Sequence, residues 1–248
     1  MVARRKLAKM WRIDQVIAQR GSHELLWCSQ AGSPQTATYF GRRFVGDRQA
    51  AEFDYFERLA VICATGNPCF PPLIAHDLDA QQPLLIFSRL NAQTMGDWLA
   101  AQTLSPAKPL LVWLARQLLE SLSGLHRLGY VHGNVRPEHL LIDDLERVKL
   151  IGLGKCTEVG MVMRLARART RYDAPEVATG GFECSSAQDV YAAAVVVAEL
   201  VGECFTRSPV AQAMLACDPA DRPVATEVVQ LLCSLENELF TAYMQRAA

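Results

Sequence analysis

The sequence lacks the features that mark membrane-spanning, zinc-binding and disordered chains. No apolar run approaches the roughly 20 residues of a membrane-spanning helix, so we expect no membrane span. No two of the eight cysteines are spaced as C-x-x-C, the spacing typical of structural zinc sites. Half of the residues are hydrophobic and 21% are charged, which excludes disorder as a description of the whole chain.

The chain also lacks an excess charge of either sign. Its 25 lysines and arginines face 26 aspartates and glutamates, for a net charge of −1, so we expect no nucleic acid partner. The opening residues MVARRKLAKMWRIDQVI carry charges but no apolar signal region. We therefore interpret the cysteines as free thiols in a reducing, cytoplasmic compartment.

A chain of 248 residues is long enough for one large domain or two small ones. The first 90 residues are rich in β-branched and aromatic residues, which favour strands. Helical spacing of apolar residues predicts one helix among them, and the prolines of NPCFPP end it. The expected strands cover 23–29, 35–41 and 83–87, and the expected helix covers 46–64.

The rest of the chain has mainly helical patterns. Apolar residues surround much of the segment 110–129, as they do in an internal helix. Further helices are expected over 185–202 and from 226 to the C-terminus, and short strands over 139–142 and 147–151. The pattern predicts a small β lobe followed by a larger α lobe.

Four segments carry motifs whose order along the chain is informative. They are GLHRLGYVHGNVRPEHLLIDDLERVKLIGLGK (124–155), RYDAPEV (171–177), DVYAAAVVVAEL (189–200) and DRP (221–223). In this order they resemble the catalytic loop, metal-binding loop and later landmarks of eukaryotic-type Ser/Thr protein kinases. The resemblance implies a bilobal α+β fold, with an N-lobe over 1–90 and a C-lobe over 91–248 that together form one domain. Asp189 and Arg222 are only 33 residues apart, so we expect a shortened late C-lobe.

The chain departs from the kinase pattern at three catalytic positions. Kinases carry H-R-D-L-K-P-E-N, in which the Asp accepts a proton and the Asn binds Mg²⁺. Asn134 stands at the position of that Asp, and an amide takes up no proton at neutral pH. His139 replaces the Asn, although Mg²⁺ prefers oxygen ligands. Gly152 replaces the metal-binding Asp of D-F-G, so the catalytic set is not intact and no metal is expected.

The nucleotide-cleft positions implied by the resemblance are also altered. Reading G-x-G-x-x-G onto 19–24 retains Gly21 alone and places Glu24, a carboxylate, against phosphate. Tyr39 matches the phosphate-binding lysine, and Glu57 the helix glutamate that pairs with that lysine. No lysine occurs between Lys9 and Lys108. Arg136 retains a positive charge near the transferring phosphate.

The positions that support the fold are retained. Glu176 and Arg222 match a buried ion pair of the family, and Asp189 matches the aspartate that binds the catalytic-loop backbone. His132 is interpreted as an organising residue of that loop. Removing one member of a buried pair is costly, so retention of both fits a folded domain.

These observations predict a pseudokinase that acts as a protein-binding scaffold or allosteric regulator. The string HGNV is also similar to the loop of the Janus-kinase pseudokinase domains. A regulatory or signalling protein is the expected partner, and no cofactor is expected beyond weak ATP binding. The alternative is an active atypical kinase or a small-molecule phosphotransferase with relocated groups. Aminoglycoside phosphotransferases are similar in beginning this loop with His-Gly, as His132 and Gly133 do.

Overall fold

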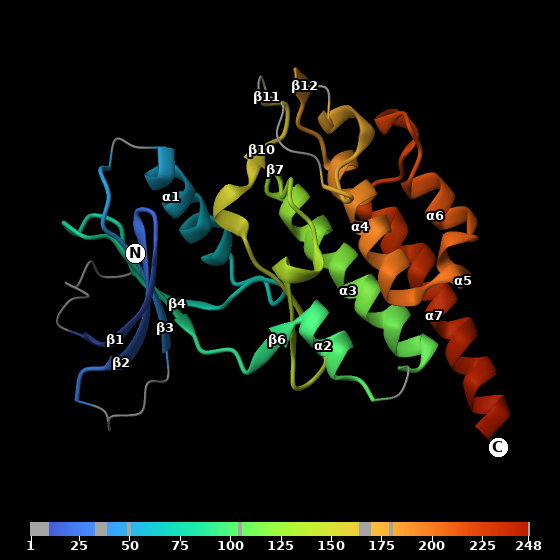
Figure 1. The fold of residues 1–248 in the computed structure, drawn as a ribbon, viewed down its shortest axis with the longest axis horizontal. Helices are drawn as coiled ribbons and strands as arrows, with labels where there is room; N and C mark the ends of the chain where they lie inside the picture. The colour runs from blue at the N-terminus through green and yellow to red at the C-terminus, as the bar shows by residue number, and fades with distance from the viewer. Residues whose placement is uncertain are drawn as a thin grey trace. The chain divides into compact units, whose positions relative to one another are not determined.

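The computed structural model describes residues 10–32, 39–48, 51–103, 106–163, 170–178 and 181–247. The chain divides into two compact units, Met1–Asn91 and Ala92–Ala248. This division falls one residue from the expected boundary. Unit 1 is rich in strands and unit 2 is mainly helical (Figure 1), so the fold is of the α+β class, as the sequence predicts.

Unit 1 is built on a five-stranded antiparallel sheet in the order β1-β2-β3-β5-β4. Its strands are β1 (Trp11–Arg20), β2 (His23–Gln30), β3 (Tyr39–Phe44), β4 (Leu73–Asp77) and β5 (Leu84–Ser88). One helix, α1 (Ala51–Cys63), packs against the sheet (Figure 1). It does so because Phe53 and Phe56 of α1 contact the ring of Phe44 at the end of β3.

The two faces of this sheet have different surroundings. On one face, Leu26, Cys28, Leu84 and Ile86 form a buried apolar cluster. Successive residues of a strand point to opposite faces, so the neighbours of these residues line the other face, which carries Phe44. We call this second side the α1 face, because α1 contacts it through Phe44.

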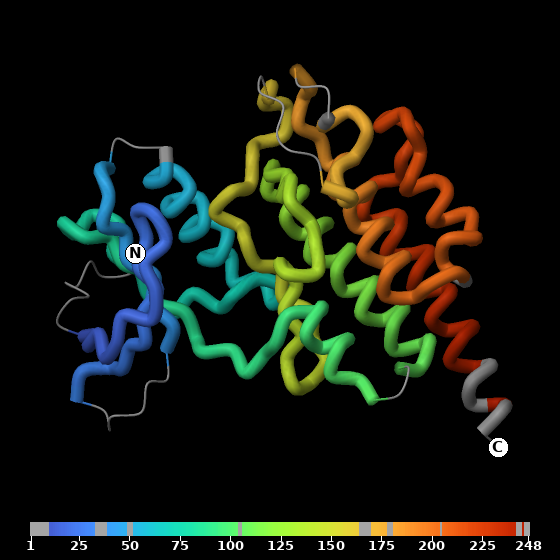
Figure 2. Tube along the Cα trace, in the orientation of Figure 1, coloured from blue at the N-terminus to red at the C-terminus, as the bar shows by residue number. Residues whose placement is uncertain are grey.

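Two long helices form the centre of unit 2. They are α3 (Lys108–Arg127) and α7 (Ala225–Ala247), which run side by side (Figure 2). Arg116 of α3 pairs with Glu236 of α7 at 2.7 Å, and Ser123 bonds to Thr226 at 3.0 Å. Because the later residue of α3 meets the earlier residue of α7, the two helices are antiparallel.

Shorter elements of unit 2 carry the loops of interest. The chain forms β6 (Ala92–Thr94), α2 (Met95–Ala101), β7 (Tyr130–Val131), η2 (Pro137–His139), β8 (Leu140–Asp143), β9 (Val148–Leu150) and η3 (Leu153–Lys155). It continues through β10 (Thr157–Glu158), β11 (Val162–Met163), η4 (Pro175–Ala178), β12 (Phe182–Glu183) and α4 (Ser186–Val201). Only α5 (Glu203–Thr206), α6 (Pro209–Met214) and η5 (Pro219–Asp221) separate α4 from α7. The late part of the unit is therefore short.

The sequence predicted the long helices and the short strands β8 and β9, but it gave no expectation for the 10-residue strand β1. The helices expected over 110–129 and 185–202 are α3 and α4, and the strand expected over 83–87 is β5. The strand expected over 35–41 is seen as β3, which continues to Phe44, and residues 35–38 lie outside the described part. No described helix is long and apolar enough to cross a membrane. No disulfide joins the cysteines whose side chains the structure describes.

Candidate functional site

The segment matched to the kinase glycine-rich loop is a tight hairpin. Arg20 at the end of β1 pairs with His23 at the start of β2, so only Gly21 and Ser22 form the turn. Gly21 has a φ of +57°, a left-handed conformation that glycine adopts without strain. The left-handed conformation at this turn therefore explains why Gly21 is a glycine.

Glu24 does not lie on the α1 face. It pairs with Arg43 of β3 across the sheet, and Arg43 donates to the Glu24 carboxylate at 2.7 Å from Nε. Residues paired across antiparallel strands share a face, and His23, next to Glu24, pairs with Phe44 of the α1 face. The Glu24 carboxylate is therefore engaged by Arg43 on the face opposite to α1.

Tyr39 also lies on the face opposite to α1. Its ring contacts Trp11 edge-on at 4.6 Å between centroids, and it packs on the apolar cluster that includes Cys28. It is paired with Cys28 in the sheet. Residues 36–38, matched to the rest of the V-A-I-K strand, lie outside the described part. Tyr39 thus packs against Trp11 and the apolar cluster on the face of β3 opposite to α1.

The α1 face of β3 carries Arg42, which the sequence reasoning missed. Arg42 pairs with Leu25 of β2 and Leu85 of β5. Its Nε is buried and has no hydrogen-bond acceptor in the described part of the chain. Arg20 and His23 share this face through the register of β1, β2 and β3. Counting alternate residues back from Phe44 would have found Arg42.

Glu57, matched to the helix glutamate, is exposed on α1. The buried residues on either side of it, Phe56 and Leu59, cover the sheet-facing side of the helix. In the described part of the chain, Glu57 takes part in no hydrogen bond or ion pair within unit 1.

In unit 2, Asp189 at the start of α4 organises the loop that follows β7. Its Oδ2 accepts from the backbone N of His132 at 2.7 Å, and its Oδ1 accepts from the backbone N of Gly133 at 2.8 Å. Nε2 of His126, near the end of α3, donates to Oδ2 at 2.9 Å. Three donors from two elements therefore converge on one buried carboxylate.

His132 is a buried structural imidazole. The amide of Asn134 donates to its Nδ1 at 3.3 Å, which leaves Nε2 as the donor to the carbonyl of Ile151 at 2.8 Å. Burial lowers the pKa of His132, although the nearby Asp189 opposes this. Both ring nitrogens are occupied within the loop, so this neutral ring has no free position for proton transfer.

Asn134, at the position of the kinase base, is held by its neighbours. Arg136 donates from Nη2 to the Asn134 Oδ1, and His139 donates from Nδ1 to the Asn134 carbonyl at 2.8 Å. An amide oxygen that already accepts from a guanidinium has no basic role at neutral pH. The pair is therefore suited to fixing the loop rather than to chemistry.

Gly152 has a left-handed backbone conformation. Its φ is +84°, and a Cβ at this position would lie 3.4 Å from the ring of His139 and 3.5 Å from Nε2 of His132. Side chains rarely adopt such a φ. Gly152 thus supplies no metal ligand, and two imidazoles lie at van der Waals distance from the place that a Cβ would take.

The neighbouring carboxylates do not replace it. Asp143 accepts from the backbone of Leu145 at 3.0 Å and from Arg147, whose Nε is 2.8 Å away, so it closes the turn between β8 and β9. Burial alone would raise the pKa of Asp143, but the hydrogen bonds from Arg147 and Leu145 outweigh it and the pKa is lowered. Across the described residues, no group of three or more acidic, histidine or cysteine side chains is placed to hold a metal ion.

Glu176 and Arg222 form the ion pair that the resemblance implied. The guanidinium contacts both carboxylate oxygens, at 2.7 and 2.8 Å. Arg222 also donates to the carbonyls of Ala216 at 2.8 Å and Cys217 at 3.2 Å, and its side chain is fully buried. The pair ties η4 to the segment that precedes α7.

A small cavity lies beside this loop. It is lined by Gly133, Asn134, Tyr172, Asp173 and Gln188, among others. Gly133 has a φ of +65°, and a Cβ there would lie 3.4 Å from Nε2 of Gln188. Gln188 therefore takes up space next to the position where kinases carry the arginine of H-R-D.

Comparison with known proteins agrees with this arrangement. The family model described as "Protein kinase domain" matches residues 76–212, more than half of the chain. The Ser/Thr protein kinase PknL of Mycobacterium tuberculosis is 28% identical over 167 residues, which cover 64% of this chain and 40% of that protein. The maternal embryonic leucine zipper kinase of Danio rerio is 32% identical over 90 residues, which cover 35% of this chain and 13% of that protein. The chain thus spans less than half the length of either relative.

Proposed function

Because the chain belongs to the protein kinase domain family, we propose that it uses this fold as a protein-binding regulatory module and transfers no phosphate. The main supporting observation concerns the three catalytic positions, which are occupied by Asn134, His139 and Gly152. Asn134 is bound by Arg136, His139 donates into the loop, and Gly152 has no side chain that could bind a metal ion. A kinase needs a base and metal-binding oxygens at these places.

The support for a binding role is that the buried interactions which stabilise the fold are retained. Asp189 and the Glu176–Arg222 pair hold the loop and the late helices in place. A buried charge without its partner destabilises a protein by several kcal/mol, so these pairs maintain a folded surface independently of catalysis. A regulatory protein partner in the cytoplasm fits this proposal.

A phosphotransfer assay tests the proposal. The purified chain is incubated with labelled ATP and Mg²⁺ or Mn²⁺, with protein acceptors and with aminoglycosides as small-molecule acceptors. We expect no label on any acceptor or on the chain itself, and no gain from Asn134→Asp. Transfer that is lost on Arg136→Gln would overturn the proposal and favour an active enzyme with relocated groups.

A further inference from the structure

The small cavity of unit 2 contains a buried oxygen without a hydrogen-bond partner. The cavity lies between the loop after β7, residues 170–177 and the start of α4. Gln188 of α4 is 7% exposed, and its Oε1 has no donor in the described part of the chain. A buried polar atom without a partner costs free energy in the folded state. A donor from outside the chain would remove this cost.

The end of the Gln188 side chain reaches across the cavity to the loop. A Cβ at Gly133 would lie 3.4 Å from Nε2 of Gln188, so the amide lies against the loop wall. The buried apolar residues that complete the lining are Val135, Ala174, Val177 and Ala192. These side chains have no donor to offer to the amide oxygen.

The charged residues of the lining are acidic. They are Asp173 and Asp189, and the described lining residues include no lysine, arginine or histidine. Asp189 accepts from the backbone N of His132 and of Gly133, and Asp173 accepts from the backbone N of Thr170 at 2.7 Å. Two carboxylates in the wall of one cavity attract a cation.

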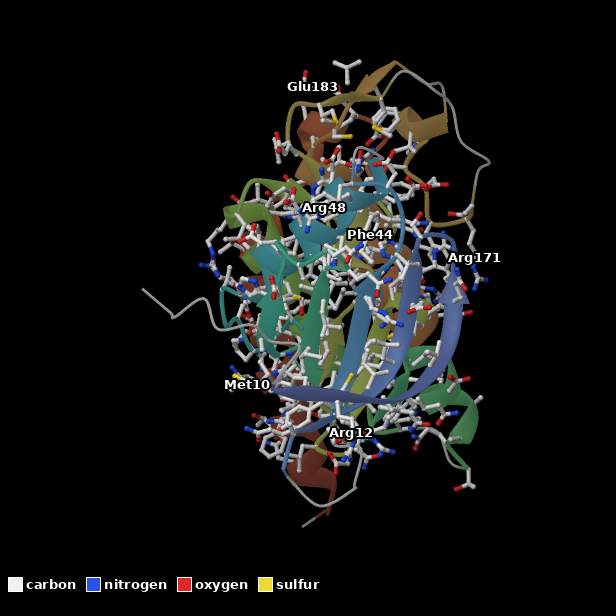
Figure 3. The ribbon with its side chains drawn as sticks, turned by 90° about the vertical axis from the view of Figure 1, so that its left-hand side faces the viewer. Met10, Arg12, Phe44, Arg48, Arg171 and Glu183 are labelled. Atoms are coloured by element: carbon white, nitrogen blue, oxygen red, sulfur yellow. The ribbon has the colours of Figure 1, made fainter. Side chains whose placement is uncertain are left out.

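The hydroxyl groups of the lining donate within the chain. Tyr172 donates to Oε2 of Glu199 at 3.2 Å, and Thr170 donates to Oδ2 of Asp173 at 3.1 Å. Arg171, between them in the sequence, pairs with Glu199 at 3.0 Å, and its side chain is 68% exposed. Figure 3 shows the Arg171 side chain pointing outward. The hydroxyl donors of the lining are therefore used, whereas the oxygen of Gln188 is not.

We propose that this cavity binds a primary ammonium group, which donates a hydrogen bond to Oε1 of Gln188 and is attracted by Asp173 and Asp189. The interior has room for a group about the size of a water molecule, which suits an ammonium and is too small for a guanidinium. An ammonium donates hydrogen bonds and accepts none. The group belongs to a small free amine or to a lysine of a partner protein. The inference goes beyond the proposed function, because an ammonium site is required neither by phosphate transfer nor by its absence.

Nuclear magnetic resonance of the isotope-labelled chain tests the proposal. The backbone amide of Gly133 and the side-chain amide of Gln188 report on the cavity. The probes are the chlorides of methylammonium, Nα-acetyl-lysine methylamide, tetramethylammonium and potassium, at equal ionic strength. We expect saturable shifts of both signals with the two primary amines and none with the other two cations, which have no N–H donor.

The two primary amines distinguish the sources of the ammonium group. Tighter binding of the lysine derivative would identify a lysine of a partner protein. An affinity for methylammonium at least as high would identify a small free amine. Shifts with potassium or tetramethylammonium as large as those with the amines, or no shift with either amine, would overturn the proposal.

Matched variants assign the binding to the cavity. Gln188→Met removes the acceptor with little change in volume and is expected to weaken ammonium binding at least about tenfold. It is expected to keep the melting temperature, because Oε1 has no partner to lose. Gln230→Met makes the same change at an exposed position of α7 and is expected to leave binding unchanged. Equal affinities in the two variants would contradict the proposal.

Asp173→Asn tests the role of charge, and it does so even if Gln188→Met fails to fold. It retains an acceptor for Thr170 and removes one negative charge from the lining. We expect about threefold weaker ammonium binding at low salt and a smaller difference at high salt. Glu238→Gln removes a charge from an exposed position of α7 and is the control. An unchanged affinity in Asp173→Asn at low salt would contradict the attraction proposed here.

Discussion

Oδ2 of Asp189 lies 2.7 Å from the backbone N of His132, and the two residues belong to different elements of unit 2. This bond connects the start of α4 to the loop after β7. It is charge-assisted and buried, which makes it stronger than a bond between neutral groups. The loop can therefore keep its shape although its catalytic side chains have been replaced.

Asp189→Ala should destabilise the protein strongly. It leaves the backbone amides of His132 and Gly133 and the ring of His126 without their common acceptor. Buried donors that lose a charged partner cost about 1–3 kcal/mol each, and these are not additive, so we expect a loss of about 3 kcal/mol. Urea unfolding measures it. Asp189→Asn retains an acceptor and should lose less; a larger loss in Asn than in Ala would contradict the network.

Arg222→Met should lower the free energy of unfolding by about 3–5 kcal/mol, because it removes the guanidinium that donates to the Glu176 carboxylate and to three backbone carbonyls. Arg207→Met is the control. Arg207 pairs with Glu203 at 2.9 Å, but both side chains are about 80% exposed, and such pairs contribute little. If the two variants unfold at the same urea concentration, the ion pair of Arg222 does not have the structural role given to it here.

Gly152→Ala should cost about 1–2 kcal/mol, since the residue must keep a left-handed backbone. Gly96, in the first turn of α2, meets only Thr94 Oγ1, at 3.9 Å, when a Cβ is added. Gly96→Ala should therefore be neutral or stabilising. Thermal unfolding of both variants checks the contrast. A Gly152→Ala protein as stable as the natural chain would show that this position tolerates a side chain.

The stability of the protein should fall as the pH drops from about 6.5 towards 4. The pKa of His23 is lowered from 6.5 to about 4, chiefly by burial. In this window the unfolded chain binds a proton at His23 that the folded chain does not, so acid favours unfolding. Buried His132, whose pKa is also lowered, acts in the same direction.

His23→Phe checks the contribution of His23. The ring stacks on Phe56 at 5.8 Å and contacts Phe44 at 5.4 Å, so a phenyl ring suits the site. Urea unfolding at a series of pH values should show a shallower decline for the variant than for the natural chain. Parallel curves would mean that His23 is protonated in the folded protein or contributes nothing.

The sequence predicted the fold, the contact of Asp189 with the loop and the Glu176–Arg222 pair, because these depend on long patterns and ordered motifs. The apolar periodicity of α3 and α4 can be recognised without knowing the register of any strand. The order of the motifs from His132 to Arg222 can be recognised in the same way. The unit 1 positions could not be assigned as precisely, for a physical reason. Side chains alternate between the faces of a strand, so a shift of one residue in matching letters moves a side chain to the other face. Tyr39 and Glu24 were assigned to the nucleotide cleft by matching sequence letters alone, and Arg42 was not singled out.

Comparing ATP affinity with and without Mg²⁺ tests most directly the proposal that this protein holds no metal ion. The chain is titrated with ATP in EDTA and again in excess Mg²⁺, with the heat of Mg·ATP formation subtracted. We predict that Mg²⁺ leaves the affinity unchanged or weakens it, because the described residues hold no group of three or more acidic, histidine or cysteine side chains placed to bind the ion. Binding at least about tenfold tighter with Mg²⁺ would contradict the account.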